Sequence, residues 1–326
     1  MTVHTVAIVQ HPPAVLDLQA SLYRAAKHIR EAANAGASLV VFPETWLTCY
    51  PAWVFGMAGW DDDEARYWHG HLLRESPALG GATDMDDDLA ELRAVAAECE
   101  VTVVMGLNER SPGGGTLYNS LATIGPDGIL LNLHRKLMPT HTERIVWGIG
   151  DAQGLRAVDT PVGRVGGLIC WEHWMPPARQ TLHASGEHIH VASWPDTSEM
   201  HLIASRHYAF EGRCFVLAAG LFITEDDVPE NLRDAFRRGT DSSLRDQGLF
   251  FDGGSSIISP NGSWVIEPVR GKPAIIVSKI DLSRIDGSVQ DLDTSGHYSR
   301  SDLFELSVNA KRPHGVVRHA EVSDGT

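Results

Sequence analysis

The stretch Gly166-Gly167-Leu168-Ile169-Cys170-Trp171-Glu172-His173 is an apolar, glycine-backed run that ends on a cysteine. Such a run is typical of a buried strand that stops at a polar and aromatic turn, so it predicts a thiol at a strand end. Ligand sites in α/β folds gather at strand ends. A lone cysteine of this kind is more often a small buried hydrophobe, so the other strand ends decide its meaning.

Two earlier apolar segments also end on a reactive group. Leu39-Val40-Val41-Phe42-Pro43-Glu44 ends on a carboxylate, and Leu130-Leu131-Asn132-Leu133-His134-Arg135-Lys136 ends on an amine. Glu44 and Lys136 alone could form a structural ion pair. A nucleophile, a base and a cation that each follow an apolar strand are the parts of a covalent acyl-transfer site. The three segments together therefore predict an enzyme.

Strand and helix patterns interleave along the chain. We expect a β-α-β unit first, with Asp17 capping its helix and Gly36 ending it. Hairpins and further helices follow; the expected strands are 3–9, 38–42, 101–107, 118–124, 129–133, 189–193, 214–219, 255–259, 263–266 and 274–280, and the later helices are 86–100 and 199–213. Strand pairs interleaved with helix pairs predict an α/β protein in which two sheets pack together with helices outside.

Two stretches differ from this pattern. Residues 224–247 are rich in charge and lack a long apolar face, so we expect a surface insertion. Residues 285–326 are expected to be an extended C-terminal extension that depends on a neighbour for order. Residues 1–284 would then form the main domain. Both stretches are candidates for contacts between subunits.

Composition limits the class of function. Of 326 residues, 43% are hydrophobic and 21% charged, which is typical of a globular protein, and the formal charge of −15 argues against nucleic acid and anionic membranes as partners. We see no signal peptide and no apolar run long enough to span a bilayer. Four widely spaced cysteines without a C-x-x-C pair fit reduced thiols, so we expect a cytoplasmic protein.

Several histidines invite a zinc interpretation. They are His173, His183, His188 and His190, with Glu187 among them. The spacing matches neither H-E-x-x-H nor C-x-x-C, so ordinary polar histidines are the expectation, and no metal is predicted.

The three strand-end segments, in this order, resemble the motifs of the nitrilase superfamily, and in particular its true nitrilase branch. The carboxylate motif runs from Phe42 to Pro51, and the lysine motif runs from His134 through Trp147 to Asp151. The cysteine motif is Gly167-Leu168-Ile169-Cys170-Trp171-Glu172-His173-Trp174-Met175-Pro176. Its Cys-Trp-Glu-His form points towards nitriles and away from amides.

The resemblance implies roles for these residues. Cys170 would be the nucleophile, Glu44 the general base, and Lys136 the group that stabilises developing negative charge, with the Trp171 backbone N–H as second donor. Glu143 matches the family's second glutamate, which positions Lys136 or substrate and can share in proton transfer. The implied reaction converts a nitrile through a thioimidate and a thioester to a carboxylic acid and ammonia, without a cofactor.

The resemblance also implies a wall for the pocket. The positions concerned are Tyr50, Thr140, Trp147, Trp171, Trp194 and Pro195. For Trp147 and Trp194, packing in the core is an equal alternative. A wall this aromatic suits an apolar or aryl substituent on the nitrile.

At the level of the whole molecule, the resemblance implies a four-layer α-β-β-α sandwich that assembles into a homo-oligomer, either a dimer or a larger spiral. Two alternatives to a nitrilase stay open. One is a related carbon–nitrogen hydrolase, such as an aliphatic amidase, an N-carbamoyl hydrolase or a cyanide-converting enzyme. The other is a non-catalytic assembly protein that keeps the fold.

Overall fold

The computed structural model describes residues 2–57, 59–79, 88–112 and 114–312. Two β-sheets pack face to face in it. The first has the strand order β13 (Ala274–Asp281), β1 (Val3–Gln10), β2 (Leu39–Val41), β3 (Thr102–Arg110), β4 (Leu117–Ile124), β5 (Leu130–Arg135). The second has the order β10 (Phe222–Thr224), β11 (Leu249–Ile258), β9 (Phe215–Gly220), β8 (Ile189–Trp194), β7 (Gly163–Ile169), β6 (Val158–Thr160), and β12 (Trp264–Arg270) pairs with β11.

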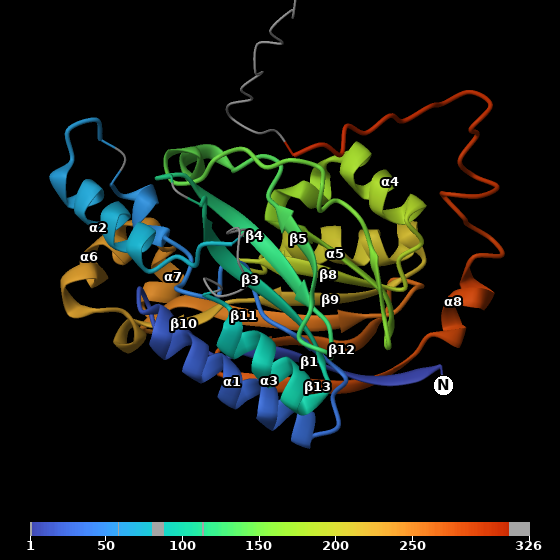
Figure 1. Ribbon diagram of the computed structural model, residues 1–326, viewed down its shortest axis with the longest axis horizontal. Helices are drawn as coiled ribbons and strands as arrows, with labels where there is room; N and C mark the ends of the chain where they lie inside the picture. The colour runs from blue at the N-terminus through green and yellow to red at the C-terminus, as the bar shows by residue number, and fades with distance from the viewer. Residues whose placement is uncertain (1, 58, 80–87, 113, 313–326) are drawn as a thin grey trace, which may run out of the picture.

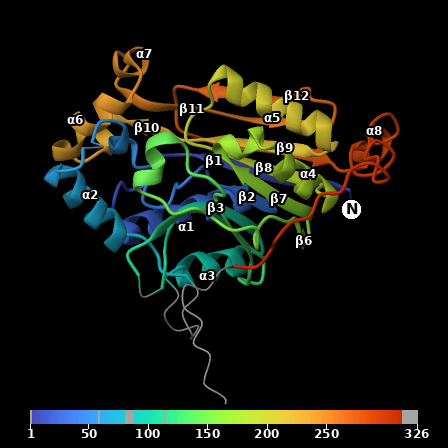
Figure 2. The same ribbon diagram turned by 90° about the horizontal axis from the view of Figure 1, so that it is seen from above.

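Helices cover both outer faces of the paired sheets. Figure 2 shows α1 (Leu18–Asn34) and α3 (Ala90–Cys99) on one side, and α4 (Pro176–Ala184) and α5 (Glu199–Gly212) on the other. The expected four-layer α-β-β-α sandwich is confirmed. The Asp17 side chain caps α1 by accepting from the Ala20 N–H, as predicted.

The remaining helices lie at the ends of the sandwich. They are α2 (Asp63–Arg74), α6 (Glu230–Gly239), α7 (Ser242–Arg245) and α8 (Ser283–Ser288), with the short 3₁₀ segments η1 (Ala52–Phe55), η3 (His141–Ile145), η4 (Cys170–Trp174) and η5 (Glu225–Asp227). Figure 1 shows α2 and α6 together at one end and α8 at the other. The first residues of the expected helix 86–100 lie outside the described part of the chain.

Alternation along the buried strands builds the core. In β1, Val6 and Ile8 join the apolar layer between the sheets, whereas Ala7 and Val9 pack with the helix layer of α1 and α3. All four side chains are fully buried. Because successive side chains of a strand point to opposite faces, a strand buried on both faces reads as a continuous apolar run.

One expectation about residues 224–247 is wrong. This stretch contains α6, whose side chains Leu232, Ala235 and Phe236 are buried. The Phe236 ring packs against Trp53 of η1, with ring centroids 6.0 Å apart. The i, i+3, i+4 spacing of these three residues forms an apolar face, and the surrounding charges conceal it in the sequence.

The strand directions bring the three strand-end motifs together. Strands β1, β2 and β3 run parallel, as do β7, β8 and β9. Glu44 follows β2, Cys170 follows β7, and Lys136 follows β5 at the edge of the first sheet. The ends of strands from two facing sheets therefore meet at one place.

Candidate active site

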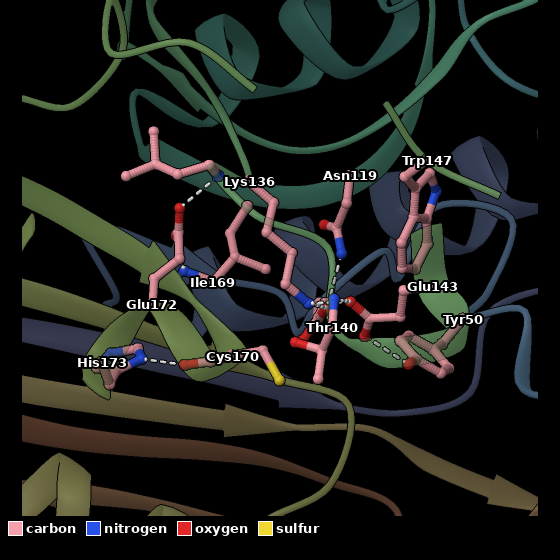
Figure 3. A network of polar contacts seen from close by, with 12 residues as sticks. Tyr50, Asn119, Lys136, Thr140, Glu143, Trp147, Ile169, Cys170, Glu172 and His173 are labelled. Atoms are coloured by element: carbon pink, nitrogen blue, oxygen red, sulfur yellow. Dashed lines mark hydrogen bonds and ion pairs between the residues drawn. The ribbon is translucent and has the colours of Figure 1, made fainter. Parts of the chain in front are cut away.

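Lys136 lies between two glutamates in the interior. Its Nζ is 2.9 Å from Glu44 Oε1 and 2.7 Å from Glu143 Oε2. Figure 3 shows the Lys136 and Glu143 side chains converging near Cys170. Cys170 Sγ and one carboxylate oxygen of each glutamate all lie within 4.8 Å of one another. The structure thus brings together the four residues that the sequence nominated as catalytic.

Other polar groups hold the two glutamates in place. The Asn119 amide donates to Glu44 Oε1 at 2.7 Å, and Glu44 Oε2 is buried with no hydrogen-bond partner. Glu143 accepts from the Tyr50 hydroxyl at 2.7 Å and from the Thr140 backbone N–H at 2.6 Å. Glu143 is therefore held by three donors, whereas Glu44 keeps one oxygen free.

Burial sets the protonation of this cluster. Burial raises the pKa of Glu44 to about 7, although Lys136 acts to lower it. Burial also raises the pKa of the Cys170 thiol well above its usual range, again against the effect of Lys136. Burial alone would lower the pKa of Lys136, but the charges of Cys170, Glu44 and Glu143 raise it instead. The resting site therefore holds a neutral thiol beside an ammonium group.

Cys170 sits in an unusual backbone conformation. Its φ is +53°, in the left-handed region that side chains with a Cβ rarely adopt. The carbonyl of Cys170 accepts from His173 Nδ1 at 2.7 Å, which closes the turn of η4. Such strain persists where the surroundings over-determine the conformation, and it concentrates at functional sites.

Glu172 joins the cysteine turn to the lysine segment. Its carboxylate accepts from the backbone N–H groups of Ile169 and Leu137, both at 2.7 Å, and from His134 Nε2 at 2.9 Å. Burial alone would raise the pKa of Glu172, but His134 and the two N–H groups hold it below its usual range. Sequence reasoning missed this role; the one signal was a carboxylate inside the cysteine motif, after Cys170 and Trp171.

Asn119 and His134 were also missed. Asn119 looks like an ordinary polar residue inside a strand, and no spacing rule points to it. His134 stood in the quoted lysine motif, but only the fold shows that its ring meets Glu172.

A cavity of about 740 Å³ opens onto Cys170. Of the expected wall residues, Tyr50, Thr140, Trp171 and Pro195 line it. The catalytic candidates Cys170 and Glu143 also line the cavity. The other lining residues, which sequence reasoning did not assign to the wall, are Phe55, His141, Trp174, Asp196, Ser198, Met200 and His201. The aromatic rings and Met200 make much of this wall apolar.

The remaining two expected wall residues lie behind the cavity. The Trp147 indole N–H donates to Asn108 Oδ1 at 2.9 Å, and the Trp147 ring packs against Tyr50. Trp194 is fully buried and stacks on His173, with ring centroids 4.5 Å apart. Neither residue lines the cavity, so the structure places both in the core packing that was the alternative for them.

Within the described ranges, Glu44, Glu143 and Cys170 are the group of side chains with the spacing of metal ligands. Lys136 Nζ already makes an ion pair with each of the two carboxylates. Its ammonium group supplies the positive charge that a metal ion would bring.

Among the helices that the structure describes, none has the length and apolar character of a membrane span.

Residues 5–288 match the carbon-nitrogen hydrolase family. This chain belongs to the carbon-nitrogen hydrolase family. The chain is 34% identical to an aliphatic nitrilase of Sinorhizobium fredii, over 98% of this chain and 100% of that protein. It is 37% identical to nitrilase 1 of Arabidopsis thaliana, over 93% and 86% of the two chains. It is also 36% identical to the bifunctional nitrilase/nitrile hydratase NIT4A of Lupinus angustifolius, over 92% and 84%.

Solved structures of carbon-nitrogen hydrolases share the fold. Saccharomyces cerevisiae Nit3, a member of branch 10 of the nitrilase superfamily, superposes with a TM-score of 0.69 at 20% identity, covering 91% of this chain and 97% of that one. The carbon-nitrogen hydrolase of Helicobacter pylori G27 gives a TM-score of 0.67 at 18% identity, covering 92% and 97%.

Proposed function

We propose that this carbon-nitrogen hydrolase is a nitrilase that converts an organic nitrile to a carboxylic acid and ammonia. The observation that carries the proposal is the cluster of Glu44, Lys136 and Cys170, in which Cys170 lines a largely apolar cavity. Relatives named nitrilases at 34–37% identity over nearly the whole chain support it. The reaction consumes two waters for each nitrile.

Glu44 activates the nucleophile. The thiol at rest is protonated, and a nitrile carbon is a weak electrophile that needs a thiolate. Glu44 Oε2 has no hydrogen-bond partner, and a carboxylate oxygen of Glu44 lies within 4.8 Å of Sγ, so Glu44 can take the thiol proton. The pKa of Glu44, raised to about 7 by burial, makes it a stronger base than an exposed carboxylate. Sγ then bonds to the nitrile carbon.

Lys136 stabilises the charge that develops on the nitrile nitrogen. Its ammonium is held from two sides by Glu44 and Glu143, so it is oriented before substrate arrives. The Trp171 backbone N–H, at the start of the η4 turn, is the second proposed donor. The proton that Glu44 took from the thiol passes to the nitrogen, which completes the thioimidate and returns Glu44 to its base form.

Hydrolysis follows in two stages. Glu44 activates a water that adds to the thioimidate carbon, and the tetrahedral species expels ammonia to leave a thioester on Cys170. A second water then releases the acid and restores the thiol. If the tetrahedral species expels the thiolate instead, the product is an amide. That branch corresponds to the second activity in the printed name of the lupin relative.

Glu143 is assigned a positioning role. Both of its oxygens accept hydrogen bonds, one from Tyr50 and the other from Lys136 and Thr140. These three donors occupy both oxygens of Glu143, whereas Glu44 Oε2 has no hydrogen-bond partner. Glu143 therefore orients Lys136 and leaves proton transfer to Glu44.

We also propose a substrate class and a setting for the enzyme. Tyr50, Thr140, Trp171 and Pro195 would contact the substituent of the nitrile, which the aromatic wall favours as an apolar or aryl group. Residues 1–284 would form the catalytic domain, and residues 285–326 would lie at an interface of a cytoplasmic homo-oligomer.

The experiment is to measure ammonia and acid release from a panel of nitriles and their matching amides. The panel holds an arylacetonitrile, a benzonitrile, an aliphatic dinitrile and cyanide. Cys170→Ala should abolish release, and Cys99→Ala serves as the matched control because Cys99 lies on α3, which contributes no residue to the cavity lining. Turnover of the amides alone would favour an amidase, and no turnover with an ordinarily reactive Cys170 would favour an assembly protein.

A further inference from the structure

A buried chain of side chains leads from the nucleophile into the outer side of the second sheet. His173 Nδ1 lies 2.7 Å from the Cys170 carbonyl oxygen (Figure 3), and His173 Nε2 lies 3.0 Å from His190 Nε2. His190 Nδ1 lies 2.8 Å from Glu187 Oε1, and the Tyr208 hydroxyl donates to Glu187 Oε2 at 2.6 Å. These four side chains are each at most 5% exposed.

Counting protons shows how many hydrogens this series of hydrogen bonds requires. A carbonyl oxygen only accepts, so His173 Nδ1 must carry a proton. The contacts from the Cys170 carbonyl through His173 and His190 to Glu187 are three hydrogen bonds, and they need three protons. Two neutral imidazoles bring one proton each. The Tyr208 proton is used on the other oxygen of Glu187, so one further proton must be present.

We propose that Glu187 is a positioning residue for the catalytic cysteine and that, as a neutral carboxylic acid, it supplies this third proton. With Glu187 protonated, each imidazole donates on the side facing Cys170 and accepts on the side facing Glu187. Every contact in the chain is then a hydrogen bond. The carboxylic acid therefore fixes, through His190, the tautomer of His173 in which Nδ1 carries the proton and donates to the Cys170 carbonyl.

Loss of the proton would leave one contact with two facing lone pairs. A buried contact of this kind is unfavourable, because neither of the two lone pairs, on nitrogen or oxygen, has a donor. The turn at Cys170 is already strained at φ +53° and depends on its surroundings to keep that shape. The His173 hydrogen bond to the Cys170 carbonyl is one of those surroundings. When Glu187 is deprotonated, the hydrogen-bond series therefore holds the Cys170 turn less firmly.

The surroundings of Glu187 favour the neutral acid. Burial raises the pKa of Glu187 to about 7, against the lowering effects of His183 and the Tyr208 hydrogen bond. Burial lowers the pKa values of both His173 and His190 well below the usual range. The proton is therefore kept on the carboxyl below about pH 7 and lost as the pH rises above it.

Several other charged or titratable groups face this part of the molecule. On the Glu187 side they are His183 of α4, Glu211 of α5, Cys214, Arg164 of β7, Arg213, His188 and Asp293, and on the histidine side they are His134, Glu172 and His201. Arg179 and His183 both bind Glu211, which keeps that charge paired. Glu187 also lines a cavity of about 340 Å³, through which its proton can exchange with solvent.

A glycine in strand β7 leaves space for the Glu187 carboxyl. A Cβ at Gly166 would lie 2.1 Å from Glu187 Oε1. Only a glycine at this position admits Glu187 beside the strand that ends at Cys170. The glycine at position 166 is thus explained by its contact with Glu187, at the far end of the hydrogen-bond series from Cys170. It is not explained by the cavity that Cys170 lines.

The test replaces the acid by its amide. In Glu187→Gln, the side-chain N–H₂ donates to His190 and the carbonyl accepts from Tyr208, so the variant copies the protonated acid at every pH. In Glu187→Leu, the matched apolar control, the donor is missing. The activity readout rests on the proposed function and uses the best nitrile of the panel, with kcat followed as a function of pH.

We expect kcat of Glu187→Gln to be close to wild type at about pH 6 and to exceed wild type by several-fold at about pH 9, because only the wild type loses the proton. Glu187→Leu should lose about tenfold or more in kcat at every pH. A constant ratio of Glu187→Gln to wild type across this range would overturn the proposal, as would wild-type kcat in Glu187→Leu.

A second readout needs no substrate. The infrared difference spectrum of wild type minus Glu187→Gln should contain the C=O stretch of a protonated carboxylic acid at about pH 6, and it should fade as the pH rises through about 7. Glu44 is present in both proteins and cancels. Absence of this band at low pH would refute the proposed protonation even if no nitrile were turned over, whereas its presence without nitrile turnover would count only against the nitrilase assignment.

Discussion

At the scale of single residues, Lys136 decides whether the cluster can work. It is 1% exposed and pairs with two buried carboxylates, Glu44 and Glu143. Lys136→Met keeps much of the side-chain volume and removes the charge. We expect kcat to fall by about 10²–10³, because charge on the nitrile nitrogen loses its stabilising partner.

The same change leaves two buried carboxylates facing each other, so the melting temperature should fall as well. A variant that lost stability but kept most of its kcat would show that Lys136 is a structural partner only. The measurements are kcat for the best nitrile and thermal unfolding of both proteins.

The raised pKa of Glu44 determines how activity should fall at acidic pH. Its pKa is raised by burial to about 7, and the base form exists above that value. Activity should therefore fall about tenfold per pH unit below about pH 7, since the protonated acid cannot take the thiol proton. Glu44→Gln should lose nearly all activity at every pH. An acid limb that persisted unchanged in a still active Glu44→Gln would assign the base to another group.

At the scale of elements, two buried carboxylates near Cys170 should respond in opposite ways to amide substitution: Glu172 in η4, and Glu187 between α4 and β8. Glu172 is an acceptor for three donors, from Ile169, Leu137 and His134, whereas Glu187 must itself donate. Glu172→Gln turns one acceptor oxygen into a donor that faces another donor. We expect a loss of about 1–3 kcal/mol in unfolding free energy and a drop in kcat.

Glu187→Gln is the matched comparison for Glu172→Gln and should keep its stability near wild type. Equal tolerance of both substitutions, measured by thermal unfolding, would contradict the assignment of Glu172 as an acceptor and Glu187 as a donor.

Elements also show how far sequence reasoning reaches. The strands ending at Glu44 and Cys170 were predictable because apolar runs with a polar stop carry a strong local signal. The face of α6 was missed because its apolar residues Leu232, Ala235 and Phe236 are scattered among charges. The link between Cys170 and Glu187 was unpredictable, since it joins η4 to β8 and α5 through the packing of their side chains. Local sequence patterns predict individual strands and helices. Side-chain contacts between distant elements can be identified only from the folded structure.

At the scale of the whole molecule, the helix layer of α4 and α5 leaves apolar side chains uncovered. Ile203 and Phe210 of α5 are 48% and 47% exposed, and Phe304 of the C-terminal extension is 73% exposed. Exposed apolar residues on one helix face commonly mark a protein–protein interface. We therefore expect a molar mass in solution that is a multiple of 35.6 kDa.

Ile203→Asp should shift that assembly to smaller species, because it places a charge in the proposed interface. Light scattering coupled to size exclusion checks both outcomes. A wild-type protein of 35.6 kDa at micromolar concentration would contradict the expected homo-oligomer.

The central claim is that Cys170 forms a covalent bond to the carbon of a nitrile. It is tested most directly by quenching the enzyme with acid during nitrile turnover and mapping its peptides by mass spectrometry. The account predicts that the peptide containing Cys170 gains the mass of the acyl or imidoyl group of the substrate. The Cys99→Ala control should show the same adduct, and Cys170→Ala should show none. Turnover that continues in Cys170→Ala, or an adduct found on another residue of the wild type, would contradict the account.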